Sequence, residues 1–127
     1  MARILVVDDD EPIRDTLRVL LEDNDHIVRE AENGAAALDI LRATSERYVV
    51  LLDLIMPVMD GVATLSAVCA DPRLRAQHVY LLVSAGGPSD IARAEPFLST
   101  LHGRVVNKPF DMDIILDAVD AATRQLD

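Results

Sequence analysis

Three short apolar segments constrain the fold of this chain more than any other feature. They read ILVV at 4–7, VVLL at 49–52 and VYLLV at 79–83. Segments this short, rich in valine and leucine, are typical of strands that a sheet buries on both faces. Two further segments, HIVREA at 26–31 and RVV at 104–106, are more polar or shorter, as edge strands are. The chain is therefore predicted to contain five strands.

Patterns typical of amphipathic helices separate these segments. Apolar residues recur at helical spacing within residues 13–21, 38–41, 62–70 and 115–126. Pro12 stands at a suitable first-turn position for the first helix, and Asp71-Pro72 is predicted to end the third. The region 88–101 is less regular, because Pro96 predicts a break or a kink in a helix there.

The alternation of strands and helices predicts the fold class. A chain that repeats β and α five times forms a parallel sheet with helices on both faces and right-handed crossovers. With the three apolar segments central and the other two at the edges, the strand order becomes 2-1-3-4-5. This is a doubly wound, flavodoxin-like (βα)5 fold of the α/β class, predicted as a single domain over residues 1–127.

The composition narrows the classes of function. A formal net charge of −10 argues against nucleic acid or an anionic membrane as a direct partner. No apolar run approaches the ~18 residues needed to span a bilayer, and no signal peptide is expected before the first strand. The single cysteine, Cys69, excludes an internal disulfide and is typical of a reducing compartment, so a cytoplasmic location is expected.

Polar side chains stand where the predicted strands end. Asp8 and Asp9 end the first strand, Asp53 the third and Ser84 the fourth, and Lys108 lies near the end of the fifth. Because the carboxyl ends of parallel strands meet at one edge of the sheet, we expect these side chains to converge there. Asp10, the next residue of the first cluster, is predicted to cap the helix that follows.

Three carboxylates in one crevice repel one another and require a cation. Oxygen ligands without histidine or cysteine favour a hard ion, Mg²⁺ or Mn²⁺, held by Asp8, Asp9 and Asp53. Lys108, the only lysine among twelve basic residues, adds a positive charge, and Ser84 adds a hydroxyl. Together these groups indicate a phosphoryl site in which Asp53 is the nucleophile and forms an aspartyl phosphate.

Four motifs carry a resemblance to a known family. They read ILVVDDDE at 4–11, VVLLDLIMPVMDG at 49–61, LLVSA at 81–85 and VVNKPF at 105–110. In this order and at this spacing, the chain resembles the receiver domain of two-component response regulators over essentially all of its length. The resemblance implies a phosphorylation-controlled signalling switch that assists its own phosphorylation but turns over no external substrate.

The same resemblance assigns roles around the acidic cluster. It implies that Asp53 accepts a phosphoryl group from the phosphohistidine of a histidine kinase or a histidine phosphotransfer domain. It also implies that Mg²⁺ is held by Asp9, Asp53 and the backbone carbonyl of Ile55. Asp8 is then expected to act mainly through water.

The resemblance also predicts how the signal leaves the site. Ser84 is implied to move toward the phosphate and Lys108 to pair with it, and the Lys108–Pro109 peptide is expected to be cis. Val105 stands where the family usually has Tyr or Phe, and Pro96 falls in its usually continuous fourth helix. The fourth helix, fifth strand and fifth helix usually carry output and dimerisation. A monomer that can dimerise on phosphorylation, and a downstream target or output domain, are therefore expected.

Three other functions compete with this interpretation. An aspartyl-phosphate phosphatase of the haloacid dehalogenase type needs a second aspartate two residues after the nucleophile, where Ile55 stands. A flavin-binding electron carrier needs a phosphate-binding loop after the first strand, where Asp8 to Asp10 would repel the phosphate. A receiver-like interaction module that does not depend on phosphorylation stays open, because Val105 and Pro96 depart from the family pattern.

Overall fold

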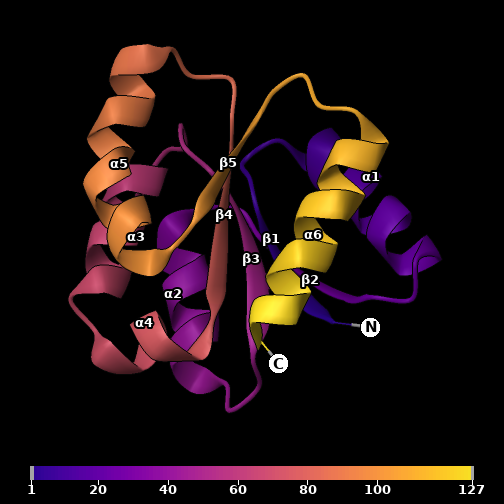
Figure 1. Ribbon diagram of the computed structural model, residues 1–127, viewed down its shortest axis with the longest axis horizontal. Helices are drawn as coiled ribbons and strands as arrows, with labels where there is room; N and C mark the ends of the chain where they lie inside the picture. Colours follow the sequence, from indigo (N-terminus) through magenta and orange to yellow (C-terminus); the bar gives the residue numbers. More distant parts are fainter. Residues whose placement is uncertain (1, 127) are drawn as a thin grey trace.

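A single five-stranded sheet forms the centre of the molecule (Figure 1). The structure is a computed structural model that describes residues 2–126. The strands are β1 (Arg3–Val7), β2 (Ile27–Ala31), β3 (Tyr48–Asp53), β4 (Val79–Ser84) and β5 (Arg104–Asn107). All neighbouring strands are parallel, and their order is β2-β1-β3-β4-β5, as predicted. The three apolar segments are the central strands, and β3 and β4 are buried along their whole length.

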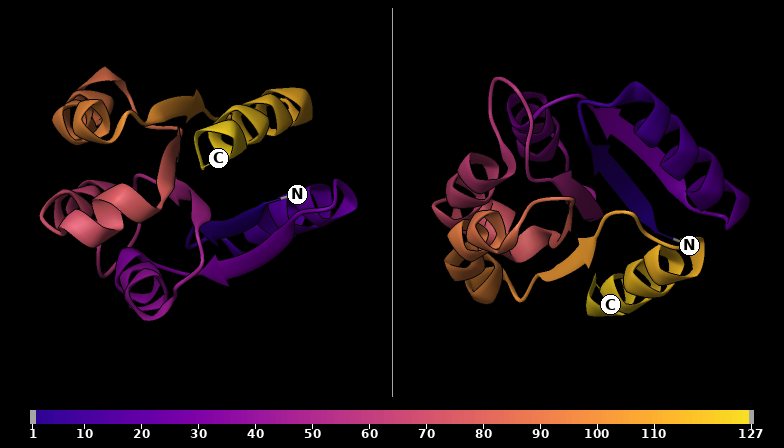
Figure 2. Two further views of the ribbon diagram at one scale, coloured as in Figure 1. Left: turned by 60° about the horizontal axis from the view of Figure 1, so that its bottom comes forward. Right: turned by 90° about the horizontal axis from the view of Figure 1, so that it is seen from above.

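Helices cover both faces of this sheet, which confirms the doubly wound architecture (Figures 1 and 2). They are α1 (Glu11–Asp23), α2 (Gly34–Ala43), α3 (Gly61–Cys69), α4 (Pro72–Gln77), α5 (Pro88–Leu101) and α6 (Met112–Leu126). One apolar core joins the sheet to α2, α3, α4 and α5, and a second joins it to α1 and α6. Among residues 2–126, no helix combines the length and the apolar character that crossing a bilayer requires.

Polar side chains define where several helices begin. Asp10 has extended backbone dihedrals, and its Oδ1 accepts the N–H of Ile13 at 3.3 Å, which confirms the predicted cap of α1. Asp60 caps α3 in the same way, with its Oδ1 2.8 Å from the N–H of Ala63. Such caps satisfy N–H groups that have no partner inside the helix. They also fix the points at which the chain leaves the carboxyl edge of the sheet.

The short helix α4 was not expected. The Asp71-Pro72 pair was predicted only to end the preceding helix, yet it also begins a new one. Asp71 Oδ1 accepts the N–H groups of Arg73 and Leu74, and proline is well suited to the first helical position. Leu74 is fully buried, and its carbonyl accepts the hydroxyl of Tyr80 at 2.9 Å. This packing stabilises a helix too short to form alone.

The sequence predicted a break or a kink at Pro96 in the helix over 88–101, and the break was wrong. The helix α5 is continuous from Pro88 to Leu101 with Pro96 inside it. Pro96 lies on the exposed face, so the carbonyl that loses its N–H partner is next to solvent. Ala94 and Leu98 are buried on the other side of the helix, and this packing outweighs the local cost of the proline.

Two buried histidines accept hydrogen bonds at the amino-terminal side of the sheet. Nδ1 of His26 accepts the N–H of Ala2, and Nδ1 of His78 accepts the N–H of Tyr48, each at 3.0 Å. Protonation of Nδ1 would remove either acceptor. Nε2 of His78 is buried with no hydrogen-bond partner within residues 2–126. Burial lowers the pKa of His26, and it lowers the pKa of His78 to about 4 from the ordinary value of 6.5.

The lowered pKa of His78 predicts that the protein loses stability in mild acid. Its folded pKa of about 4 lies below the ordinary 6.5, so the unfolded chain binds more protons between these values. The free energy of unfolding should be fully retained above pH 6.5 and should fall as the pH approaches 4, by about 3 kcal/mol from this residue. Urea unfolding of the parent and of His78→Asn at pH 7.5, 6 and 4.5 measures this contribution.

The asparagine variant provides the control for other titrating groups. Its side-chain oxygen can accept the N–H of Tyr48 but does not titrate. The difference in unfolding free energy between the parent and His78→Asn should therefore narrow as the pH falls from 7.5 to 4.5. A difference that stays constant over this range would contradict the predicted role of His78.

Candidate functional site

Three carboxylates meet at the carboxyl edge of the sheet, as predicted. Asp8 follows β1 directly and Asp53 is the last residue of β3, and these strands are neighbours. One carboxylate oxygen from each of Asp8, Asp9 and Asp53 lies within 4.8 Å of the other two. Asp8 and Asp53 are buried and Asp9 is exposed. The cluster is therefore open to solvent on the side of Asp9.

Lys108 joins this cluster from the far end of the chain. Its Nζ donates to Oδ2 of Asp8 at 3.0 Å and lies 3.5 Å from Oδ1 of Asp53. The Lys108–Pro109 peptide is cis, as expected. The backbone N–H of Lys108 also donates to the carbonyl of Ser84 at 2.8 Å, which ties the loop after β5 to the end of β4. The ammonium is thus held between two aspartates of different strands.

The charges of the site perturb one another. Burial raises the pKa of Asp53, the negative charge of Asp8 raises it further, and Lys108 lowers it in part. Burial alone would lower the pKa of Lys108, but its hydrogen bond to Asp8 and the charge of Asp53 raise it overall. Three carboxylates and one ammonium leave an excess of negative charge in a small volume. Such a set of oxygen donors fits a hard divalent cation.

The hydroxyl of Ser84 is buried and accepts a hydrogen bond. Oγ of Ser84 accepts the N–H of Gly86 at 2.8 Å, within the loop that leads to α5. A Cβ at position 86 would lie 3.0 Å from this Oγ and 3.0 Å from Cβ of Asp90. The position therefore has little room for a side chain. The sequence indicated Ser84 as a site residue, but it offered no signal for the contact with Gly86.

The loop after β3 is folded tightly against the site. Gly61 donates its N–H to the carbonyl of Leu54 at 2.7 Å, which closes the loop over residues 54–61. Within it the side chain of Ile55 is 63% exposed, whereas that of Met56 is buried in the core. The side chain of Ile55 therefore lies in solvent and not in the core. Ile55 stands two positions after Asp53 in the sequence.

Arg14 is a site neighbour that the sequence analysis missed. Its Nη1 donates to the backbone carbonyl of Asp8 at 2.6 Å, and its Nε lies 3.3 Å from Oε1 of Glu30. Oδ1 of Asp8 accepts the N–H of Asp10 at 2.9 Å, so both the backbone and the side chain of Asp8 are fixed. Arg14 lies only six positions after Asp8 in the sequence, which is a weak hint of this contact. No motif or hydrophobic periodicity in the sequence singled out this arginine.

Comparison with known proteins shows the family. The model of the response regulator receiver domain matches residues 4–120. The chemotaxis protein CheY of Halobacterium salinarum is 28% identical over 117 residues, which cover 92% of each chain. The transcriptional regulatory protein ResD of Bacillus subtilis is 34% identical over 124 residues, covering 97% of this chain and 48% of ResD. The chain belongs to the response regulator receiver family.

The solved structures agree with this assignment at the level of the fold. The Vibrio cholerae chemotaxis protein CheY4 superposes with a TM-score of 0.82 at 24% identity, over 96% of this chain and 98% of that one. The chain spans about half the length of ResD and of the Response regulator MprA of Mycobacterium, but nearly the whole of the Halobacterium CheY. It is thus a CheY-like receiver domain, the kind of module that acts as a phosphorylation-dependent switch.

Gly61→Ala is predicted to destabilise the loop beside Asp53. An added Cβ would lie 2.6 Å from the carbonyl oxygen of Asp53 and 2.7 Å from Cα of Leu54, so the backbone must shift. We expect a loss of about 2 kcal/mol in the free energy of unfolding, as in other overpacked sites. Gly87→Ala is the matched control, because a Cβ there meets nothing within 4 Å. Equal losses in the two variants, measured by urea unfolding, would refute the steric argument.

Proposed function

We propose that this domain is a signalling switch that is turned on by phosphorylation of Asp53. The observation that carries the proposal is that Asp53 belongs to a cluster of three carboxylates and lies 3.5 Å from the ammonium of Lys108. Membership of the receiver family supports the same role. The donor is a histidine kinase or a histidine phosphotransfer domain, since receiver domains in general act with such proteins.

The transfer uses the carboxylate of Asp53 as nucleophile. A carboxylate oxygen attacks the phosphorus of the donor's phosphohistidine, a P–O bond forms, and the P–N bond breaks to leave the imidazole on the donor. Lys108 lies 3.5 Å from Oδ1 of Asp53 and would pair with the oxygens of the bound phosphoryl group. The cluster is open to solvent beside Asp9, which leaves the donor a route to Asp53.

The metal ligands we propose are Asp9, Asp53 and the backbone carbonyl of Ile55. Both oxygens of Asp8 are already engaged, one by the N–H of Asp10 and the other by Lys108. This supports a role for Asp8 through water instead of direct ligation. Bound Mg²⁺, or Mn²⁺, supplies positive charge that offsets the charge of the carboxylates and of the transferring oxygens.

Ser84 is the proposed switch residue. Its Oγ now accepts the N–H of Gly86, and turning toward a phosphoryl group on Asp53 would require that this hydrogen bond break. The loop from Gly86 to α5 would then lose one of its anchors. Because Val105 replaces the usual aromatic residue, this loop supplies an alternative route for the signal. The proposal treats residues 1–127 as one domain that acts on a downstream target or output domain and turns over no external substrate.

Phosphorylation of Asp53 is the first prediction of this proposal. Incubation of the chain with a small phosphodonor such as acetyl phosphate and Mg²⁺ should add one phosphoryl group, seen in the intact mass. Asp53→Asn should gain none, since the amide is not a nucleophile of this kind. Replacement of Mg²⁺ by EDTA should abolish the gain in the parent.

The same experiment distinguishes the phosphorylation switch from the interaction module that does not depend on phosphorylation. If the parent gains no phosphoryl group with any donor or cation, the acidic crevice is not an acceptor. The interaction module that does not depend on phosphorylation then becomes the leading function. A gain in Asp53→Asn equal to the parent would instead show that another residue is the acceptor.

Slow loss of the phosphoryl group is a further prediction. Ile55 and Gly86 flank the site, and neither side chain can orient an attacking water. We therefore expect the phosphorylated form to persist for minutes or longer at neutral pH with Mg²⁺ present, followed by intact mass after removal of the donor. Ile55→Asn, which adds a polar group, should shorten this lifetime. A parent lifetime of only seconds would contradict the prediction.

A further inference from the structure

The side chain of Asp9 is placed by the backbone on either side of it. Asp9 is exposed, and within residues 2–126 no N–H group donates to its carboxylate. One of its oxygens nevertheless lies within 4.8 Å of one oxygen of Asp8 and one of Asp53. Because a peptide unit is planar, the two units that flank Asp9 decide where its Cα and Cβ lie. The contacts of these two units therefore determine how well Asp9 is positioned.

Arg14 holds the peptide unit before Asp9. Its Nη1 donates to the carbonyl of Asp8 at 2.6 Å, and this carbonyl belongs to the unit that joins Asp8 to Asp9. Among the described residues, the sheet supplies no donor to this oxygen. The N–H of Asp8 bonds to the carbonyl of Ala31, but β2 ends there and the parallel ladder goes no further. Arg14 thus takes the place of a strand neighbour.

The peptide unit after Asp9 has an anchor of its own. The N–H of Asp10 donates to Oδ1 of Asp8 at 2.9 Å. Oδ2 of the same carboxylate accepts a hydrogen bond from Nζ of Lys108 at 3.0 Å. Both units that flank Asp9 are therefore tied to Asp8, one through its carbonyl oxygen and the other through its side chain.

A carboxylate of β2 fixes the guanidinium of Arg14. Nε of Arg14 lies 3.3 Å from Oε1 of Glu30, while Nη1 reaches Asp8. The side chain of Arg14 is only 15% exposed and that of Glu30 is 31% exposed, so water and salt screen this pair only in part. The other oxygen of Glu30 lies 3.4 Å from Nε of Arg18, which forms no hydrogen bond to Asp8 in the described part of the chain. Glu30 therefore binds two arginines of α1, and one of them reaches the site.

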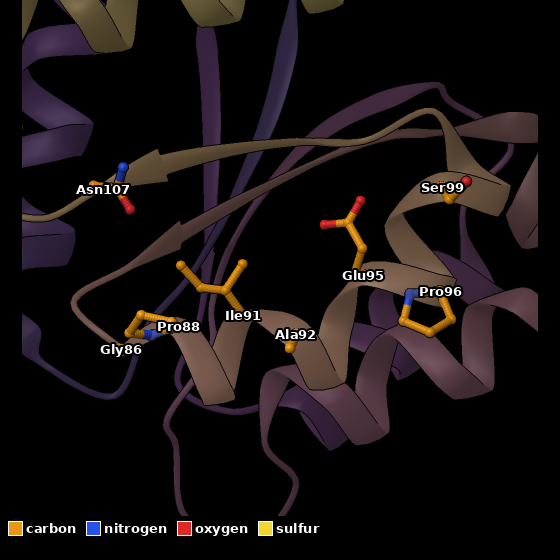
Figure 3. Close-up of a pocket in the computed structure, with 8 residues that line it drawn as sticks. All are labelled: Gly86, Pro88, Ile91, Ala92, Glu95, Pro96, Ser99 and Asn107. Carbon is orange, nitrogen blue, oxygen red and sulfur yellow. The ribbon is translucent and has the colours of Figure 1, made fainter.

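The loop on the other side of the site is held differently. Gly86 donates to Oγ of Ser84 within the loop itself, and this loop borders a groove of about 870 Å³ between β5 and α5. Figure 3 shows Gly86 and Pro88 on one side of this groove and Asn107, at the end of β5, on the other. A loop with room beside it suits a switch, whereas a loop that a partly buried ion pair fixes suits a metal ligand.

We propose that Arg14 is a positioning residue for the metal site. By holding the carbonyl of Asp8, it sets the orientation of the peptide unit before Asp9 and so the direction in which the Asp9 carboxylate points. The inference rests on the proposed function, since it takes Asp9 as a ligand of Mg²⁺. In this role Arg14 acts through the backbone and touches neither the cation nor the phosphoryl group. Groups that orient metal ligands commonly change the affinity for the metal by about 10- to 100-fold.

The positive charge of Arg14 should act against cation binding. A guanidinium near the cluster repels Mg²⁺, so its removal would by charge alone strengthen the binding of Mg²⁺. Loss of the hydrogen bond to Asp8 would instead free the Asp8–Asp9 peptide unit and weaken the binding of Mg²⁺. The two effects have opposite signs. The sign of the measured change therefore distinguishes a positioning role from an electrostatic one.

Mg²⁺ titration of the metal-free chain, followed by amide NMR, tests the proposal. In Arg14→Met the dissociation constant for Mg²⁺ should rise about tenfold, since methionine keeps an apolar stem but has no donor. Arg18→Met is the matched control, because it removes the same charge from the same helix and the other contact with Glu30 but no contact with Asp8. It should leave the dissociation constant unchanged or lower it.

Arg14→Lys separates geometry from charge. Lysine keeps the positive charge and a donor but cannot bridge Asp8 and Glu30 with a planar fork. Its dissociation constant for Mg²⁺ should lie between those of the parent and Arg14→Met, although its charge should repel the cation more than methionine does. If Arg14→Met does not fold, weaker Mg²⁺ binding by Arg14→Lys than by the parent still tests the proposal at constant charge.

Hydrogen exchange gives a second readout that needs no cation. The N–H of Asp10 is protected by Oδ1 of Asp8, so a looser Asp8–Asp9 unit should expose it more often. In the metal-free protein, exchange at Asp10 should be about tenfold faster in Arg14→Met and unchanged in Arg18→Met. Amides of β3 should keep their protection in both variants, which shows that the fold is retained.

Two results would overturn this inference alone. A dissociation constant in Arg14→Met equal to or below that of the parent would show that Arg14 does not position the site. Equal weakening in Arg14→Met and Arg18→Met would trace the effect to Glu30 and not to the carbonyl of Asp8. A parent chain that shows no saturable shift with Mg²⁺ would instead overturn the proposed metal site, and this inference with it.

Discussion

The parallel pairing of β1 with β3 is the constraint on which the acidic site depends. The register sets Val7 opposite Leu52, so the residues that follow, Asp8 and Asp53, are brought to the same level by backbone hydrogen bonds. The side chains themselves would repel one another. What holds them together is burial of the apolar residues of both strands in the two cores. Burial of apolar residues in the cores therefore offsets the unfavourable repulsion among the carboxylates of the site.

Compensation for this repulsion comes from residues remote in sequence. Lys108 reaches Asp8 across one hundred positions, and Arg14 fixes the backbone of the same residue from the helix that follows. The ammonium of Lys108 balances only one of the three carboxylates, so the site keeps an excess of negative charge. A site of this kind is preorganised for a cation and a phosphoryl group, because its donors are already held in place before either arrives. Preorganisation here is a property of the fold and of two basic side chains together.

The strands and the main site could be predicted because they depend on local pattern and topology. Short apolar segments define β1, β3 and β4, and the residues that end parallel strands must meet. The failures depend on tertiary packing. Burial of Leu74 stabilises the unexpected α4, and burial of Ala94 and Leu98 carries α5 past Pro96. The contacts of Arg14 with Asp8 and of Gly86 with Ser84 follow from the positions of whole elements, which no local pattern encodes.

Ser84 connects the acidic site to the loop that leads to α5. Its carbonyl accepts the N–H of Lys108, and its hydroxyl accepts the N–H of Gly86, a residue that also lines the groove beside β5. This contact supplies a physical route for coupling that needs no aromatic ring at position 105. Coupling between two sites is reciprocal in free energy. If rotation of the Ser84 hydroxyl changes the loop before α5, a partner that binds this loop must change the free energy of phosphorylation of Asp53 by the same amount. The loop from Ser84 to Gly86 is therefore the element through which a change at Asp53 would reach α5.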